Sequence, residues 1–126
     1  MDLVCVTVDC HDPGLVARFW NEALGWGGVA VAEDGTGAIC GPRGGGTYLE
    51  FVRVPEAKTV KNRIHLGLSA GTLAELDTEI DRLLALGAAI AWEEEFPRHV
   101  AAVYRNVILR DPEGNEFCLG GGKQPD

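Results

Sequence analysis

The segment VCVTVDCHDPGLVARFWNEALG, residues 4–25, decides the fold. Its first six residues are rich in β-branched side chains and predict a strand. Asp12 and Pro13 follow as a helix N-cap and a proline at the first helical position. Apolar side chains then recur at helical spacing as far as Gly25, which stands where helices commonly end. The segment therefore predicts a strand followed by an amphipathic helix.

Three short strand-like runs follow this helix, and turns rich in glycine separate them. We expect these strands over residues 27–33, 37–41 and 47–54. The first part of the chain, residues 1–56, thus has the order strand, helix and three strands, written βαβββ.

The second part of the chain, residues 61–122, repeats this order. We expect a strand from Arg63 to Ser69, and then a helix that begins at a capping box formed by Thr72 and Glu75. Gly87 is expected to end this helix. Further strands are expected over residues 88–93, 101–110 and 115–119. Because the two parts match with a nearly constant offset, the sequence predicts an α+β fold of two βαβββ modules.

Composition narrows the class of protein. A chain of 126 residues makes one domain, so residues 1–126 are expected to fold as a unit. The net charge of -8 and the pI of about 4.8 disfavour nucleic acid and anionic membranes as partners. No apolar stretch approaches the ~20 residues of a membrane span, and the first residues are expected to form a strand and not a signal peptide. The four cysteines are therefore expected to be reduced thiols of a cytoplasmic protein.

Alternation along the strands sorts their side chains into two faces. In each module one face is expected to pack against the helix, and it carries mostly apolar residues. The opposite, open faces are expected to carry a set of polar side chains. This set comprises Cys5, Thr7, Tyr48, Glu50, Arg63, His65 and Cys118.

The whole chain resembles the vicinal oxygen chelate superfamily, and most of all its glyoxalase-like branch. The resemblance rests on an ordered set of short motifs: Asp9–Pro13, Phe19-Trp20, Leu24-Gly25, Lys61–Leu66, Leu86–Ala88 and Asp111–Cys118. It implies the glyoxalase/bleomycin resistance/dihydroxybiphenyl dioxygenase fold, in which two modules form an open, cupped mixed sheet with one helix per module. It also implies a homodimer and a small-molecule ligand bound in the cup.

The resemblance further implies a set of metal-binding positions, which Cys5, Glu50, His65 and Cys118 occupy here. Metal-binding members usually carry His, Glu, His and Glu, so both cysteines depart from the pattern. The sequence therefore leaves undecided whether a divalent metal (zinc, nickel, iron or manganese) is bound, because cysteine and histidine are good zinc ligands. The alternative is that Cys5 and Cys118 bind no metal and are small, buried thiols. An extradiol dioxygenase is disfavoured, since its iron needs two histidines and a carboxylate.

Glu50 and His65 are the candidate catalytic pair, with Glu50 as base and His65 as acid or metal ligand. Thr7, Tyr48 and Arg63 are candidate ligand-binding residues, and Arg63 is suited to an anionic group. Two functions are open: a lyase or isomerase, and a non-catalytic antibiotic-binding or resistance protein. An aromatic content of 7% disfavours a large drug-binding groove, so the enzyme is slightly preferred.

Overall fold

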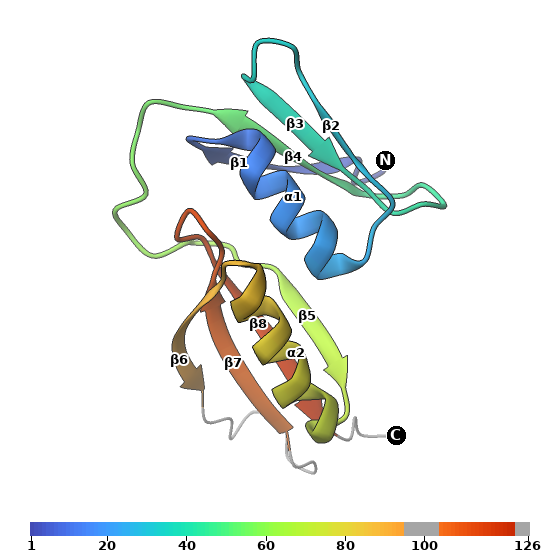
Figure 1. Cartoon of the computed structure of the whole chain (residues 1–126), viewed down its shortest axis with the longest axis vertical. Coiled ribbons are helices and arrows are strands. Elements are labelled where there is room, and N and C mark those ends of the chain that lie inside the picture. The colour runs from blue at the N-terminus through green and yellow to red at the C-terminus, as the bar shows by residue number, and fades with distance from the viewer. Residues whose placement is uncertain (95–103, 123–126) are drawn as a thin grey trace. The chain divides into compact units, whose positions relative to one another are not determined.

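The computed structural model describes residues 1–94 and 104–122. The chain divides into two compact units, which we call module 1 (residues 1–59) and module 2 (residues 60–126). Each contains one helix and a four-stranded mixed sheet in the order strand, helix and three strands (Figure 1). The predicted pair of βαβββ modules is confirmed. In the described part of the chain, no helix has the length and apolar character needed to cross a membrane.

Module 1 contains one helix, which packs on one face of a four-stranded sheet. Its elements are β1 (Cys5–Cys10), α1 (Pro13–Leu24), β2 (Val29–Val31), β3 (Gly37–Cys40) and β4 (Tyr48–Arg53). The strand order is β1-β4-β3-β2, with β1 and β4 parallel and the other neighbours antiparallel. Helix α1 packs against β2, β3 and β4. One face of this sheet is therefore covered by the helix, and the other is open.

Local signals set both ends of α1. The Asp12 carboxylate accepts a hydrogen bond of 3.2 Å from the Leu15 N–H, and Pro13 occupies the first helical position. Gly25 ends the helix in the left-handed conformation, with φ of 64°, which glycine adopts without strain. Phe19 and Trp20 are buried with their rings edge to face, 5.5 Å between centroids. Their predicted place in the core is confirmed.

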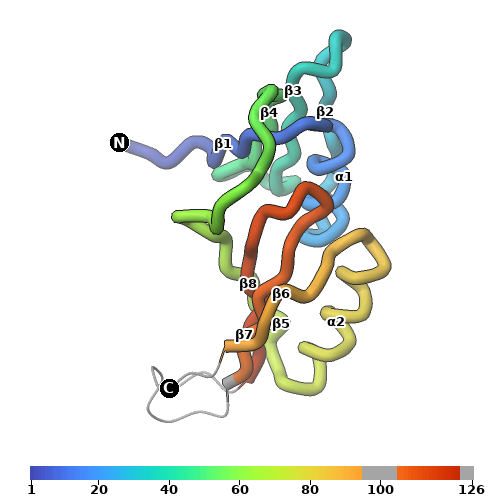
Figure 2. The backbone as a smooth tube through the Cα atoms, turned by 90° about the vertical axis from the view of Figure 1, so that its left-hand side faces the viewer, coloured from blue at the N-terminus to red at the C-terminus, as the bar shows by residue number. Residues whose placement is uncertain are grey.

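Module 2 repeats the arrangement. Its elements are β5 (Gly67–Gly71), α2 (Leu73–Leu86), β6 (Ala89–Glu94), β7 (Tyr104–Arg110) and β8 (Glu116–Gly122). The strand order is β5-β8-β7-β6, with β5 and β8 parallel. Helix α2 runs along one face of this sheet (Figure 2). Phe117 and Leu109 are fully buried in the core of the module.

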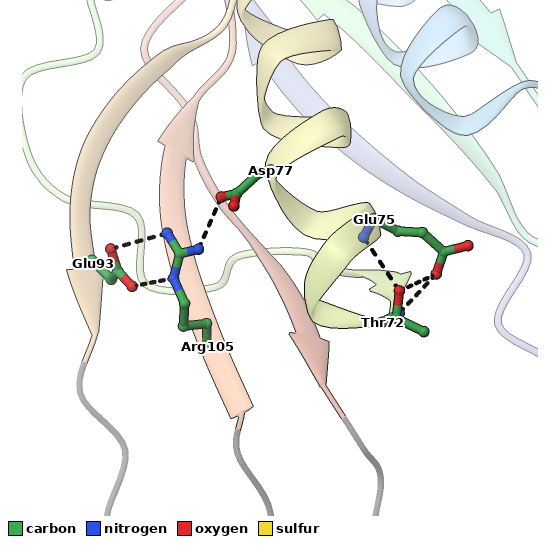
Figure 3. A network of polar contacts seen from close by, with 5 residues as sticks. All are labelled: Thr72, Glu75, Asp77, Glu93 and Arg105. Atoms are coloured by element: carbon green, nitrogen blue, oxygen red, sulfur yellow. Dashed lines mark hydrogen bonds and ion pairs between the residues drawn. The ribbon is translucent and has the colours of Figure 1, made fainter.

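Two polar clusters fix α2 (Figure 3). The predicted capping box is present: the Glu75 N–H donates to the Thr72 hydroxyl at 3.2 Å, and the Thr72 N–H donates to the Glu75 carboxylate at 2.8 Å. Arg105 on β7 forms ion pairs with Glu93 on β6 at 2.6 Å and with Asp77 on α2 at 2.9 Å. The second cluster therefore ties the helix to two strands.

The strand expected from Arg63 to Ser69 is wrong in its first half, because β5 begins at Gly67. Ile64, which the alternation assigned to the helix face, is 80% exposed. Asn62 donates its N–H to the Glu116 side chain at 3.1 Å instead of joining the sheet. The apolar residues alternate as in a strand, but a strand also needs a neighbouring strand to which its backbone is hydrogen-bonded. The chain forms such bonds with β8 only from Leu66 onward. Residues 101–103 of another expected strand lie outside the described part.

The four cysteines are free and differ in burial. Cys10 and Cys40 are buried in module 1, and burial raises the pKa of Cys40 from 9.0 to about 11. Cys5 and Cys118 are half-buried. The stabilisation that comes from keeping Cys40 neutral is present below pH 9.0 and is lost as the pH rises towards 11.

We therefore expect unequal thiol reactivity. In the native protein at mildly alkaline pH, Cys5 and Cys118 react with a thiol reagent, whereas Cys10 and Cys40 react only after unfolding. Reaction with dithionitrobenzoate, followed by peptide mapping, measures this order. Labelling of Cys40 as fast as Cys5 in the native state would contradict the burial pattern.

Candidate functional site

Four polar side chains gather on the open face of module 1. In the parallel ladder Cys5 lies beside Tyr48, and Thr7 lies beside Glu50. The intervening residues of both strands face the helix, and among them Leu49 and Phe51 are buried. The predicted faces of these two strands are confirmed, so four of the candidate residues share one surface.

A hydrogen bond between neighbouring strands orients the carboxylate of this group. The Thr7 hydroxyl donates to Glu50 Oε1 at 2.8 Å, and Cys5 Sγ lies 3.8 Å from the same hydroxyl. Electrostatic interaction with Cys5 and a hydrogen bond to it raise the pKa of Tyr48. The phenol therefore stays protonated at neutral pH.

A shallow depression of about 360 Å³ adjoins this group on module 1. Among the described residues that line it, Glu50 is the only ionisable one. Small and apolar residues form the remainder: Ala30, Val31, Ala32, Gly37, Ala38, Ile39 and Val52. This volume lies within the range of small-molecule sites. The depression therefore offers a small molecule an apolar surface with one carboxylate at its side.

The remaining candidate site residues, Arg63, His65 and Cys118, belong to module 2. Arg63 and His65 are exposed and lie before β5 begins, whereas Cys118 lies in β8 beside Gly67. Cys118 occupies the place in β8 that Glu50 occupies in β4, and burial raises the pKa of its thiol. Glu50 and His65 are thus carried by different modules, and their cooperation stays a prediction.

Asn106 on β7 was not anticipated as a site residue. Its side chain forms a hydrogen bond with Cys118, on the face of the sheet turned away from α2. The available signal was a polar residue directly before the apolar run Val107–Leu109, at a position that alternation assigns to the same face as Cys118. Glu94 is its neighbour on β6 and accepts a hydrogen bond from Trp92 Nε1 at 3.5 Å.

Neither module forms a metal centre by itself from its described residues. Within residues 1–94 and 104–122, no group of three or more His, Cys, Asp and Glu side chains is arranged to hold an ion. Module 1 supplies only Cys5 and Glu50 of the four predicted positions, and zinc sites use three or four protein ligands. The Thr7 hydroxyl already bonds one oxygen of Glu50. The donor set of module 1 therefore does not fit a metal ion.

A family model described as a glyoxalase-like domain matches residues 5–120. The chain belongs to this family. No curated protein matches the sequence. The glyoxalase-like chain is similar in fold to a glyoxalase/bleomycin resistance protein/dioxygenase family enzyme from Burkholderia phytofirmans PsJN. The identity is 18%, the TM-score is 0.72, and the match covers 96% of this chain and 98% of the other.

Two further solved structures share the fold of this glyoxalase-like domain. One is lactoylglutathione lyase from Agrobacterium tumefaciens, with 18% identity, a TM-score of 0.63 and coverage of 94% and 91% of the two chains. The other is a fosfomycin resistance protein variant from Listeria monocytogenes, complexed with Mn(II) and 1S,2S-dihydroxypropylphosphonic acid. It has 14% identity, a TM-score of 0.71 and coverage of 96% and 89%. At these identities the likeness concerns the fold alone.

Proposed function

We propose that this glyoxalase-like domain binds a small organic molecule and that Glu50 acts as general base in a lyase or isomerase reaction. The observation that carries the proposal is the Glu50 carboxylate, held by Thr7 at 2.8 Å beside an apolar depression. The hydrogen bond restrains one carboxylate oxygen and leaves the other to receive a proton. A base fixed near a bound molecule is the arrangement that general base catalysis requires.

The remaining candidates have supporting parts in the proposal. Tyr48 contacts the ligand through its protonated phenol, whose oxygen can accept a hydrogen bond. Thr7 orients the base. His65 supplies a proton to the intermediate, and Arg63 neutralises an anionic group of the substrate. The parts given to His65 and Arg63 rest on their family positions and on their exposure in module 2.

One observation favours the second candidate function, a non-catalytic antibiotic-binding or resistance protein. The depression is mostly apolar, and cysteines occupy two of the positions where metal-binding relatives carry ligands. Such a protein would hold its ligand without changing it. For either function we propose a cytoplasmic location, which the four free thiols support.

A binding and conversion assay tests the proposal. Fosfomycin and lactoylglutathione are suitable first probes, because two structural neighbours are named for these compounds. Backbone amide shifts should map the bound probe to β1, β3 and β4. Conversion that depends on Glu50 supports the enzyme, and binding without conversion supports the alternative. Shifts confined to the α1 side of the sheet would contradict both.

Homodimer assembly is a further prediction. Val31 and Ile39 on the strands of module 1 are large apolar side chains that are 43% and 42% exposed. Pairing of two chains would cover such residues. Light scattering at micromolar concentration should give the mass of two 13.5 kDa chains. The mass of one chain under these conditions would contradict the prediction.

A further inference from the structure

Asn106 combines deep burial with an unpaired oxygen. Its side chain is only 4% exposed. Within residues 1–94 and 104–122, its Oδ1 is the single buried side-chain nitrogen or oxygen that has no hydrogen-bond partner. Leaving an amide oxygen buried and unpaired costs folding free energy, so folded proteins rarely keep such groups without a use. Sites where a sequence sacrifices stability are often functional.

The neighbours of Asn106 make up a polar group on the face of the module 2 sheet turned away from α2, at a place where side chains bury it. Asn106 pairs with Glu94 on β6 and with Gly120 on β8, and Val107 beside it is buried on the α2 side. The Asn106 side chain is hydrogen-bonded to Cys118, which engages the amide but leaves Oδ1 unsatisfied. Glu94 and Cys118 are half-buried, so solvent reaches the edge of this group.

The second acceptor of the group is the Glu94 carboxylate. Trp92 Nε1 donates to Glu94 Oε1 at the long distance of 3.5 Å, which leaves most of the acceptor capacity of the carboxylate unused by this bond. Asn106 and Glu94 are direct neighbours across the β6–β7 ladder. Two oxygen acceptors thus lie side by side, and both suit a molecule that presents hydroxyl or N–H groups.

We propose that Asn106 is a ligand-recognition residue whose Oδ1 accepts a hydrogen bond from a hydroxyl or N–H group of a small organic molecule, with Glu94 as the adjacent acceptor. The proposal rests on the open sheet faces being the binding surface, but it does not require that Glu50 act as a base. A site built around an unpaired acceptor rejects analogues that lack the donor, because the acceptor then stays unsatisfied.

Thermal unfolding provides the first test, with Asn21→Leu as the matched control for Asn106→Leu. Asn21 is also buried, at 9% exposure, but its Oδ1 accepts a hydrogen bond of 3.0 Å from the Gly28 N–H. We expect Asn21→Leu to lower the Tm by about 5 °C. Asn106→Leu should keep or raise the wild-type Tm, because it removes an unpaired oxygen. A fall in Tm for Asn106→Leu as large as for Asn21→Leu would show a structural role and overturn the proposal.

Binding of two matched probes provides the second test. Phenol and anisole share the aromatic ring, but only phenol carries a donor. In titrations followed by the backbone amide signals of β7 and β8, which both chains retain, the wild-type protein should bind phenol about ten-fold more tightly than anisole. Asn106→Leu should bind both alike, whereas a purely steric preference would survive this substitution. Equal affinity in the wild type, or no shift of Asn106 with phenol, would overturn the proposal. Glu33→Gln, at an exposed carboxylate between β2 and β3, should leave the phenol preference unchanged. The titration measures binding and not turnover, so its outcome is separate from that of the general base.

Discussion

Glu50→Gln should lower turnover by about 10²–10⁴-fold, the usual contribution of a positioned general base. Glutamine has nearly the same shape and its Oε1 can still accept the hydrogen bond of the Thr7 hydroxyl. It cannot take up a proton at neutral pH, so the chemical step is lost and the binding surface is kept. We therefore expect a large fall in kcat with an affinity close to that of the wild type. Steady-state kinetics and a separate binding titration measure the two effects.

Glu33→Gln is the matched control. Glu33 is an exposed carboxylate of the same module, between β2 and β3, and its replacement changes the net charge by the same amount. Turnover should be unchanged in this variant. Both variants should keep the free energy of unfolding within about 0.5 kcal/mol of the wild type, because neither side chain belongs to the core. Turnover by Glu50→Gln at the wild-type rate would remove Glu50 from the mechanism and favour another base or the binding protein.

Gly121→Ala should destabilise module 2 by about 1–3 kcal/mol, and Gly121→Val by more. Gly121 lies in β8 where the strand passes under the first turn of α2. A Cβ atom at this position would be 2.8 Å from the Thr72 carbonyl oxygen and 3.0 Å from the Leu76 Cβ. The first of these is a backbone atom of the capping turn, and therefore it cannot move without displacing the helix. Chemical denaturation followed by circular dichroism measures the loss.

Gly44→Ala is the matched control for this substitution. A Cβ at Gly44 meets no atom within 4 Å, and the residue lies in the exposed loop before β4. Its free energy of unfolding should stay within about 0.5 kcal/mol of the wild type. Equal stabilities of the Gly121→Ala and Gly44→Ala chains would mean that α2 does not pack as closely on β8 as the structure shows.

Helix ends were predictable because their signals act over a few residues. The Asp12 cap bonds a backbone group three residues away, and the Thr72–Glu75 capping box spans the same distance. Gly87, with φ of 117°, ends α2 for the same kind of local reason. The turn at Asp111 was also predictable from local signals, since the Asp111 carboxylate accepts hydrogen bonds from the N–H groups of Glu113 and Asn115.

The open face of module 1 was predictable as well. Alternation alone assigns Cys5 and Thr7 to one side of the first strand and Tyr48 and Glu50 to one side of the fourth. That these two sides form a single surface depends on the parallel pairing of β1 with β4, which the βαβββ order suggests. Alternation could not identify the bond between Thr7 and Glu50, because it joins residues 43 positions apart.

The sequence by itself determined the two modules, their helices and the faces of β1 and β4, because neighbouring residues encode these features through caps, turns and periodicity. Only the tertiary structure decided that β5 begins at Gly67, that Gly121 must lack a side chain beneath α2, and that the Asn106 oxygen is buried without a partner. These features depend on which strand or helix packs against a residue. Such contacts join distant parts of the chain, and the local pattern of residues does not record them.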